Sequence, residues 1–182
     1  QVSATTPVAT TQAPTPTATP TTTPVVNVSN FSEIRTLSGH DSSVNSVSWS
    51  PDGTKIASGS YHPQIRIWDI SSGSILMNLS GYYDDIVNSV AWSPDGTKIV
   101  SGSWDATVKI WDASSGSLLR TLSGHVCFVD SVAWSPDGTK IASGSGETTI
   151  ACDITIKIWD ANSGSVLKTL SGHKETVNSL AW

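Results

Sequence analysis

One pattern of about 42 residues recurs along most of this chain, and it limits the possible folds more than any other feature. Each copy has a Gly-His pair near its start, a Trp-Ser-Pro-Asp-Gly segment in its middle and a Trp-Asp pair toward its end. The first pair stands at Gly39-His40, Gly81-Tyr82, Gly124-His125 and Gly172-His173, which gives spacings of 42, 43 and 48 residues. A fixed period of this length indicates a repeat architecture in which each copy forms one supersecondary unit.

Each copy contains four short runs rich in β-branched and aromatic residues. In the first copy these runs cover 44–49, 55–58, 64–68 and 75–79. The segment Ser50-Pro51-Asp52-Gly53 predicts a tight turn, because Pro presets φ, Asp bonds its own backbone and Gly supplies a positive φ. No window shows helical periodicity over ten residues. The sequence therefore predicts an all-β chain built of four-stranded antiparallel meanders.

These marks resemble those of the WD-repeat β-propeller family, and the resemblance covers residues 34–182. It implies that each meander is one propeller blade, whose first strand lines the central channel and whose last strand lies outside. Full blades are then expected at about 44–79, 87–122 and 129–170, with an outer strand at 34–37 and a lone inner strand at 177–182 that starts the next blade. Propellers close with about four to eight blades. We therefore expect an incomplete ring of about three and a half blades, completed by further repeats of a longer protein or by a second chain.

Residues 1–32 differ from the repeats in composition. Residues 1–24 contain ten Thr, five Pro and no charge, so this part cannot bury a core and is predicted to be a disordered linker or stalk, or an ordinary spacer. Asn-x-Ser sequons at Asn27, Asn30 and Asn78 add slight support for an extracytoplasmic or cell-surface location over a cytoplasmic one. The chain has no initiator Met, so we expect a fragment or a processed form.

Charge and hydropathy argue against two kinds of partner, nucleic acids and membranes, and the cysteine content bears on a disulfide. A net charge of −5 and a pI near 5.1 argue against nucleic-acid binding, which needs clustered Lys and Arg. No apolar run approaches the roughly 18 residues of a membrane helix. Cys127 and Cys152 belong to the same copy, which allows either one disulfide or two free thiols.

A Ser, a His, an Asp and a Trp recur in the copies. The first three could be mistaken for a hydrolase triad, but a triad occurs once, whereas this set is repeated, and a buried indole N–H needs an acceptor. The resemblance implies structural hydrogen-bonded tetrads, formed by His40, Ser58 and Trp68, by Ser101, Asp105 and Trp111, and by His125, Ser143, Asp153 and Trp159. We therefore predict no enzyme, and no metal or cofactor.

Two of these tetrads are incomplete. His62 stands in place of the first Asp, and Tyr82 replaces the second His. Either degenerate repeats have drifted or a site has been released for binding. We predict that these two blades are less rigid at that edge.

The resemblance implies that peptides bind at the loops around Gly-His and at the turns between second and third strands. The partner-binding candidates there are Asn45, Tyr61, Tyr82, Tyr83, Asn88, Trp104, Phe128, Asp130 and Asn178. Trp104 is the one Trp of eight outside the repeat pattern, so it either contacts a partner or fills a loop against the next blade. Acidic residues gather in or beside the same loops, which suits a basic partner or merely keeps the surface soluble; these are Asp41, Asp84, Asp85, Asp105, Asp130, Glu147, Asp153 and Glu175, against Lys174.

We therefore predict a non-catalytic scaffold that binds proteins or peptides through this face. The first alternative is an extracytoplasmic sensor or ligand-binding module of a larger membrane protein, such as a receptor-like kinase. The second is a hydrolase, which would require a unique polar cluster outside the repeats, and the sequence contains none.

Overall fold

The computed structural model describes residues 32–62, 64–80, 85–146, 152 and 154–182. Within these residues the chain forms β-strands of six residues each and no helix. The strands are β1 (Val44–Trp49), β2 (Lys55–Ser60), β3 (Gln64–Asp69), β4 (Ile75–Ser80), β5 (Val87–Trp92), β6 (Lys98–Ser103), β7 (Thr107–Asp112), β8 (Leu118–Ser123), β9 (Val129–Trp134), β10 (Lys140–Ser145), β11 (Thr155–Asp160) and β12 (Val166–Ser171).

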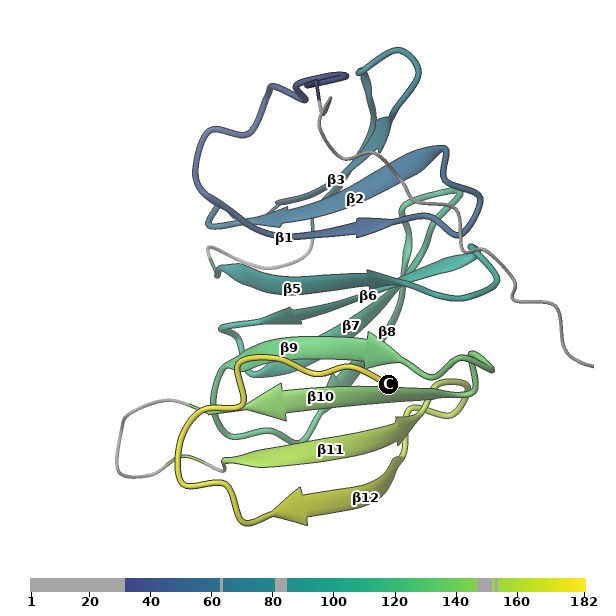
Figure 1. The fold of residues 1–182 in the computed structure, drawn as a ribbon. Helices are drawn as coiled ribbons and strands as arrows, with labels where there is room; N and C mark the ends of the chain where they lie inside the picture. Colours follow the sequence, from purple (N-terminus) through teal and green to yellow (C-terminus); the bar gives the residue numbers. More distant parts are fainter. Residues whose placement is uncertain (1–31, 63, 81–84, 147–151, 153) are drawn as a thin grey trace, which may run out of the picture. The chain divides into compact units, whose positions relative to one another are not determined.

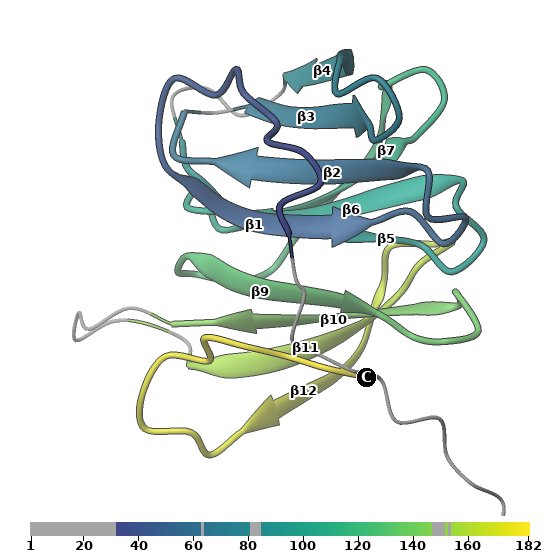
Figure 2. The ribbon, with the colours of Figure 1, turned by 45° about the horizontal axis from the view of Figure 1, so that its top comes forward.

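The strands form three antiparallel four-stranded sheets in sequence order, which we call blade 1 (β1–β4), blade 2 (β5–β8) and blade 3 (β9–β12). All three belong to the compact unit 34–182. This arrangement confirms the predicted all-β fold of propeller blades, and the sheets do not close into a ring (Figures 1 and 2).

Neighbouring blades pack through their first strands, because β1, β5 and β9 lie side by side (Figure 1). Ser46 Oγ of β1 accepts the backbone N–H of Val90 in β5 at 3.0 Å, and Ser89 and Val132 repeat this bond at 3.1 Å between blades 2 and 3. Gly59 meets Val87 so closely that a Cβ on the glycine would lie 2.6 Å from a valine methyl carbon. A larger residue at Gly59 would force these two blades apart.

The hydrophobic core lies between blades rather than within one sheet. One cluster joins blades 1 and 2 through residues that include Ile67, Leu79 and Trp111. The other joins blades 2 and 3 through the equivalent Ile110, Leu122 and Trp159. Each of these side chains is at most 2% exposed, so each blade depends on its neighbour to cover its apolar face.

The strand predictions for 34–37 and 177–182 were wrong, because neither segment is a hydrogen-bonded strand. A β-ladder needs a neighbouring strand, and no described strand pairs with either segment. The second segment nevertheless takes the place of an inner strand. The Leu180 N–H bonds Ser131 Oγ at 2.9 Å, and Val177 packs on Gly144 as Val87 packs on Gly59.

The turns at the ends of β1, β5 and β9 are held by their own Asp side chains. Asp52 Oδ1 accepts hydrogen bonds from Ser50 Oγ at 2.6 Å and from the Thr54 N–H at 2.9 Å, while Gly53 adopts a φ of +69°. The Ser50 bond is the largest cause that lowers the pKa of Asp52 to about 2. Asp69, Asp95 and Asp112 hold other turns in the same way, and their pKa is also lowered to about 2 by hydroxyl and backbone donors.

These turns predict a loss of stability in acid. Because the pKa of each of these carboxyls is lower in the folded chain than its ordinary value of 3.8, the unfolded chain binds more protons as the pH falls from about 4 toward 2. The stabilisation is fully present above about pH 4 and is lost below it. Urea unfolding midpoints measured from pH 7 to pH 2.5 should fall below pH 4, and Asp95→Asn should flatten this dependence. A midpoint constant over that range would contradict the role of the turns.

Ala106 is the one described non-glycine residue with a positive φ, at 63°. Its Cβ is crowded in this left-handed region, at a cost of about 1 kcal/mol. Ala106→Gly should therefore raise the free energy of unfolding by about 1 kcal/mol. Urea denaturation can compare it with Ala113→Gly, in a turn without positive φ, which should lower the stability instead. Equal effects of the two changes would exclude strain at Ala106.

Candidate functional site

The candidate site lies on the loop face, the end of the blades formed by the segments before β1, β5 and β9 and by the connections β2–β3, β6–β7 and β10–β11. The antiparallel order of the strands puts the Asp-held turns at the opposite end. Loops at one end of a rigid sheet stack are where proteins commonly place their binding residues.

Three aromatic side chains from three blades meet on the loop face. The rings of Trp104 and Phe128 stack with centroids 4.5 Å apart and planes 2° from parallel. Tyr61 meets Trp104 edge-on, with centroids 6.4 Å apart. Tyr61 is 55% exposed and Trp104 is 39% exposed. We call these three residues the aromatic row, and it crosses both blade borders.

The backbone positions each member of the row. The Tyr61 N–H bonds Ser43 O at 2.9 Å, and the Trp104 N–H bonds Ile86 O at 3.1 Å. Each of these two bonds ties a loop between second and third strands to the segment that enters the first strand of the same blade. The backbone that carries Tyr61 and Trp104 is therefore restrained before a partner arrives, which lowers the entropy lost on binding.

A disulfide joins Cys127 to Cys152, with the two Cα atoms 5.4 Å apart. It links the segment before β9 to the β10–β11 connection, and Cys127 immediately precedes Phe128. A crosslink across 25 residues of sequence contributes about 3 kcal/mol by restricting the unfolded chain. The same bond restrains the backbone that carries one end of the aromatic row.

The other candidates separate into three groups. Asn45 Nδ2 donates to Val87 O at 3.2 Å, and Asn88 Nδ2 donates to Asp130 Oδ1 at 2.9 Å. Asn45, Asn88 and Asp130 therefore stabilise the blade borders. Asn178 is exposed beyond β12. Tyr82 and Tyr83 lie outside the described residues, as do Asp84, Glu147 and Asp153.

Two buried cations under the loop face were not recognised in the sequence. Lys109 is 6% exposed, and its Nζ contacts Asp105 Oδ2 and Thr107 Oγ1. Arg66 is 8% exposed, donates to Asn78 and Gln64, and lies 3.8 Å from Asp41 Oδ2. Both stand two residues before the Trp of the Trp-Asp pair, and this recurrence was the signal that could have revealed them.

The acidic residues of the described loops differ in their surroundings. Asp105 is paired with Lys109, whereas the Asp41 side chain, although 3.8 Å from Arg66, is 75% exposed and Glu175 is exposed. The carboxylates of the described loops that can meet a partner are Asp41, Asp85 and Glu175, beside the single cation Lys174.

The serines of the tetrads are buried and hydrogen-bonded within their blades. In blade 1, Trp68 Nε1 donates to Ser58 Oγ at 2.7 Å, and this oxygen lies 2.6 Å from His40 Nε2. The hydroxyl oxygen thus accepts the indole bond and shares a second hydrogen bond with the His40 ring. Burial is the first cause that lowers the His40 pKa, and nearby Arg66 adds to it. Ser58 is 3% exposed, so no substrate can reach its oxygen.

Blade 3 repeats this chain of bonds, and blade 2 keeps part of it. His125 Nε2 and Trp159 Nε1 each lie 2.7 Å from Ser143 Oγ, and Trp111 Nε1 donates to Ser101 Oγ at 2.8 Å. His62 of blade 1 is exposed, and its carbonyl, not its ring, accepts bonds from Ser60 and Gln64. Whether blades 1 and 2 are less rigid stays a prediction.

In the described part of the chain, no group of three or more His, Cys, Asp or Glu side chains could hold a metal ion. No helix there is long and apolar enough to cross a membrane.

The tetrads predict a large cost for losing the central hydroxyl. Ser143→Ala would leave the buried Trp159 N–H and His125 Nε2 without this partner, which should lower the free energy of unfolding by about 2–3 kcal/mol. Urea denaturation should show less than about 0.5 kcal/mol for Ser123→Ala, an exposed serine of β8. A small cost at Ser143 would mean that the tetrad does not stabilise blade 3.

The sequence profile of the family described as "WD domain, G-beta repeat" (WD40) matches residues 31–69, 73–112 and 116–160. Short segments are similar to curated proteins. One is 55% identical over 40 residues to the vegetative incompatibility protein HET-E-1 of Podospora anserina, covering 22% of this chain and 3% of that protein. Another is 45% identical over 53 residues to the nuclear distribution protein PAC1 of Candida tropicalis, covering 29% of this chain and 11% of that protein.

Solved structures agree with the sequence match. The structure of U3-55K superposes with a TM-score of 0.74 and 28% identity, over 80% of this chain and 44% of that one. The RRP9 WD40 repeats give the same TM-score and identity, over 80% of this chain and 43% of theirs. This chain thus spans less than half of either structure and a small fraction of its curated relatives. With its repeats matched over most of its length and its blades superposed on solved propellers, the chain belongs to the WD40 repeat family.

Proposed function

We propose that this chain is a non-catalytic scaffold that binds a protein or a peptide on its loop face, with the aromatic row at the centre of the contact. WD40 propellers generally serve as protein-interaction scaffolds. The observation that carries the proposal is the row itself, since the partly exposed Trp104 stacks on Phe128 and meets the partly exposed Tyr61, which joins residues of three blades. Large aromatic side chains held in rigid positions supply contact area at a small entropic cost, and they dominate many interfaces.

The charges around the row favour a basic partner. Asp41, Asp85 and Glu175 stand on the same face against Lys174, and a Lys or Arg side chain can also rest against an exposed indole. Electrostatic attraction would mainly speed the encounter and fix its orientation. We therefore propose a peptide segment that carries Lys or Arg beside an apolar residue.

We also propose that further repeats or a second chain complete the ring, and that the chain has an extracytoplasmic location as part of a larger membrane protein. What the names of HET-E-1, PAC1 and U3-55K describe belongs to those proteins, and this chain covers only a part of each.

A peptide array offers the direct test. Trp104→Ala should reduce binding of Lys- and Arg-containing peptides at least about tenfold, as expected for removal of a hot-spot aromatic. Trp49→Ala is the matched control, because Trp49 is also exposed, at 55%, but ends β1 at the opposite end of the blade.

The array has one result that supports the proposal and one that contradicts it. Loss with Trp104→Ala and retention with Trp49→Ala would support the proposal, and acidic peptides of equal length should bind more weakly than basic ones. Equal binding by both variants and the unchanged chain would remove the aromatic row from the site.

A further inference from the structure

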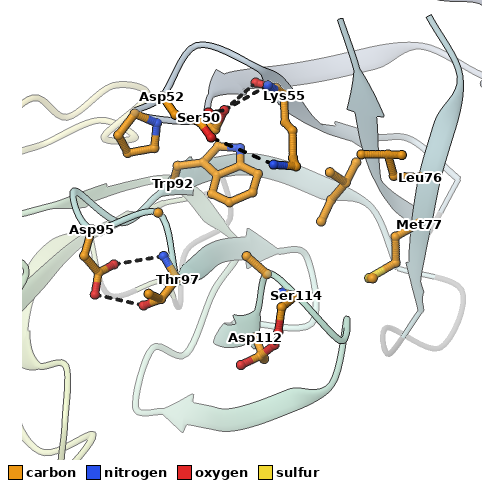
Figure 3. A pocket seen from close by; sticks show the side chains of 14 residues that line it. Ser50, Asp52, Lys55, Leu76, Met77, Trp92, Asp95, Thr97, Asp112 and Ser114 are labelled. Carbon is orange, nitrogen blue, oxygen red and sulfur yellow. Dashed lines mark hydrogen bonds and ion pairs between the residues drawn. The ribbon is translucent and has the colours of Figure 1, made fainter. Parts of the chain in front are cut away.

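A cavity of about 620 Å³ opens between blades 1 and 2 at the end opposite the loop face (Figure 3). Its apolar wall is formed by Ile67, Leu76 and Met77 of blade 1 and by Trp92 of blade 2. Its polar wall comes from the Asp-held turns. This volume lies within the range of about 300–1,000 Å³ that proteins use for small ligands.

The pocket beside Trp134, at the equivalent border between blades 2 and 3, is much smaller, at about 80 Å³. One cause is the residue four positions before the Gly-His pair. In blade 2 this residue is Arg120, whose Nη2 donates to Asn162 O of the next blade at 2.8 Å. In blade 1 it is Met77, which cannot make this bond and which lines the open cavity.

The hydrogen bonding of Trp92 and Trp134 is a second, independent difference between the two blade borders. Trp134 Nε1 donates to Ala91 O across the border of blades 2 and 3 at 3.2 Å. Trp92 occupies the equivalent position at the border of blades 1 and 2, but its buried Nε1 has no hydrogen-bond partner within the described structure. An unpaired buried donor is costly, so this border is incompletely packed around Trp92.

The cavity is also negatively charged. Asp52, Asp95 and Asp112 line it, and Lys55 is the cation among its lining residues, at 3.9 Å from Asp52. Hydrogen bonds within the turns lower the pKa of all three carboxyls to about 2, so they stay ionised at neutral pH. The donors to Asp112 from Ser114 and Ser115 all reach its Oδ1, so these bonds do not occupy Oδ2.

We propose that this cavity binds a small organic amine whose apolar body packs against Trp92 and Met77 and whose ammonium group lies beside Asp95 and Asp112. An apolar body replaces water along the open wall, and the ammonium group is attracted by the surplus of carboxylates. The site is separate from the loop face, so it does not rest on the proposed peptide binding.

The test uses three probes with one apolar body and different head groups, namely 4-phenylbutylamine, 4-phenylbutanol and 4-phenylbutyrate. Calorimetric titration of the full chain should give a Kd for the amine at least about fivefold below that of the alcohol, and weaker binding still for the carboxylate. An alcohol or a carboxylate that binds as tightly as the amine would overturn the proposal.

Variants locate the site. Met77→Arg introduces the residue that closes the next border, so it should weaken amine binding at least about tenfold, whereas Met77→Leu should retain it. Asp112→Asn should weaken the amine about fivefold without changing the alcohol, and it tests the site even if Met77→Arg does not fold. Trp104→Ala, on the loop face, should leave amine binding unchanged.

Two results would overturn the assignment. One is amine binding that is unaffected by both Met77→Arg and Asp112→Asn. The other is amine binding that is lost with Trp104→Ala, which would place the ligand on the loop face. A failure of peptide binding in the array would not affect the amine-binding proposal, because the two experiments probe opposite ends of the blades.

Discussion

The structure depends on the contact between the second strand of one blade and the first strand of the next. Gly59 and Gly102 leave room for Val87 and Val129 to approach, and Ser46 and Ser89 bond the backbone of the neighbouring strand. A four-stranded meander cannot bury an apolar face by itself, so its tryptophans and isoleucines become core only when this approach is possible. The repeated glycine is therefore as necessary to the fold as the repeated tryptophan.

The packing between neighbouring blades also brings the proposed binding residues together. Because each border is fixed by backbone-level packing, side chains that lie 24 to 43 residues apart in sequence, such as Tyr61, Trp104 and Phe128, meet in one row. The disulfide of Cys127 and Cys152 adds a covalent restraint at the end of the row where the loop is longest. The scaffold supplies rigid spacing, and the loops supply the individual side chains.

The repeated residues made the fold predictable from the sequence. The hydrogen-bond partners of individual polar side chains were less predictable. The period and the Pro-Asp-Gly turns placed the strands, and Trp104 stood out because it broke the pattern. By contrast, the sequence does not show that the amides of Asn45 and Asn88 cross to the next blade. The sequence placed Asp105 both in a tetrad and among the acidic loop residues, and it did not reveal the ion pair with Lys109. Sequence shows which residue types recur, but it does not show which way a polar side chain turns when a neighbouring blade offers it a closer partner.

The segments 34–37 and 177–182 show a second limit of prediction from sequence, which concerns strand pairing. Their sequences match strands, yet strand geometry is a property of a pair, and no described strand pairs with them. Val177 and Leu180 still make the contacts of a first strand with blade 3. Packing between blades thus operates even where the ladder within a blade is missing.

Each blade border can change without altering the next, since repeats of this kind interact mainly with their nearest neighbours. At one border Arg120 and Trp134 complete their hydrogen bonds, whereas at the other Met77 and Trp92 leave space and an unpaired donor. In a chain of near-identical repeats, one blade border can therefore be closely packed while another contains a cavity that can bind a ligand. The cost of the open border is local, because the second core cluster shares no residue with the first.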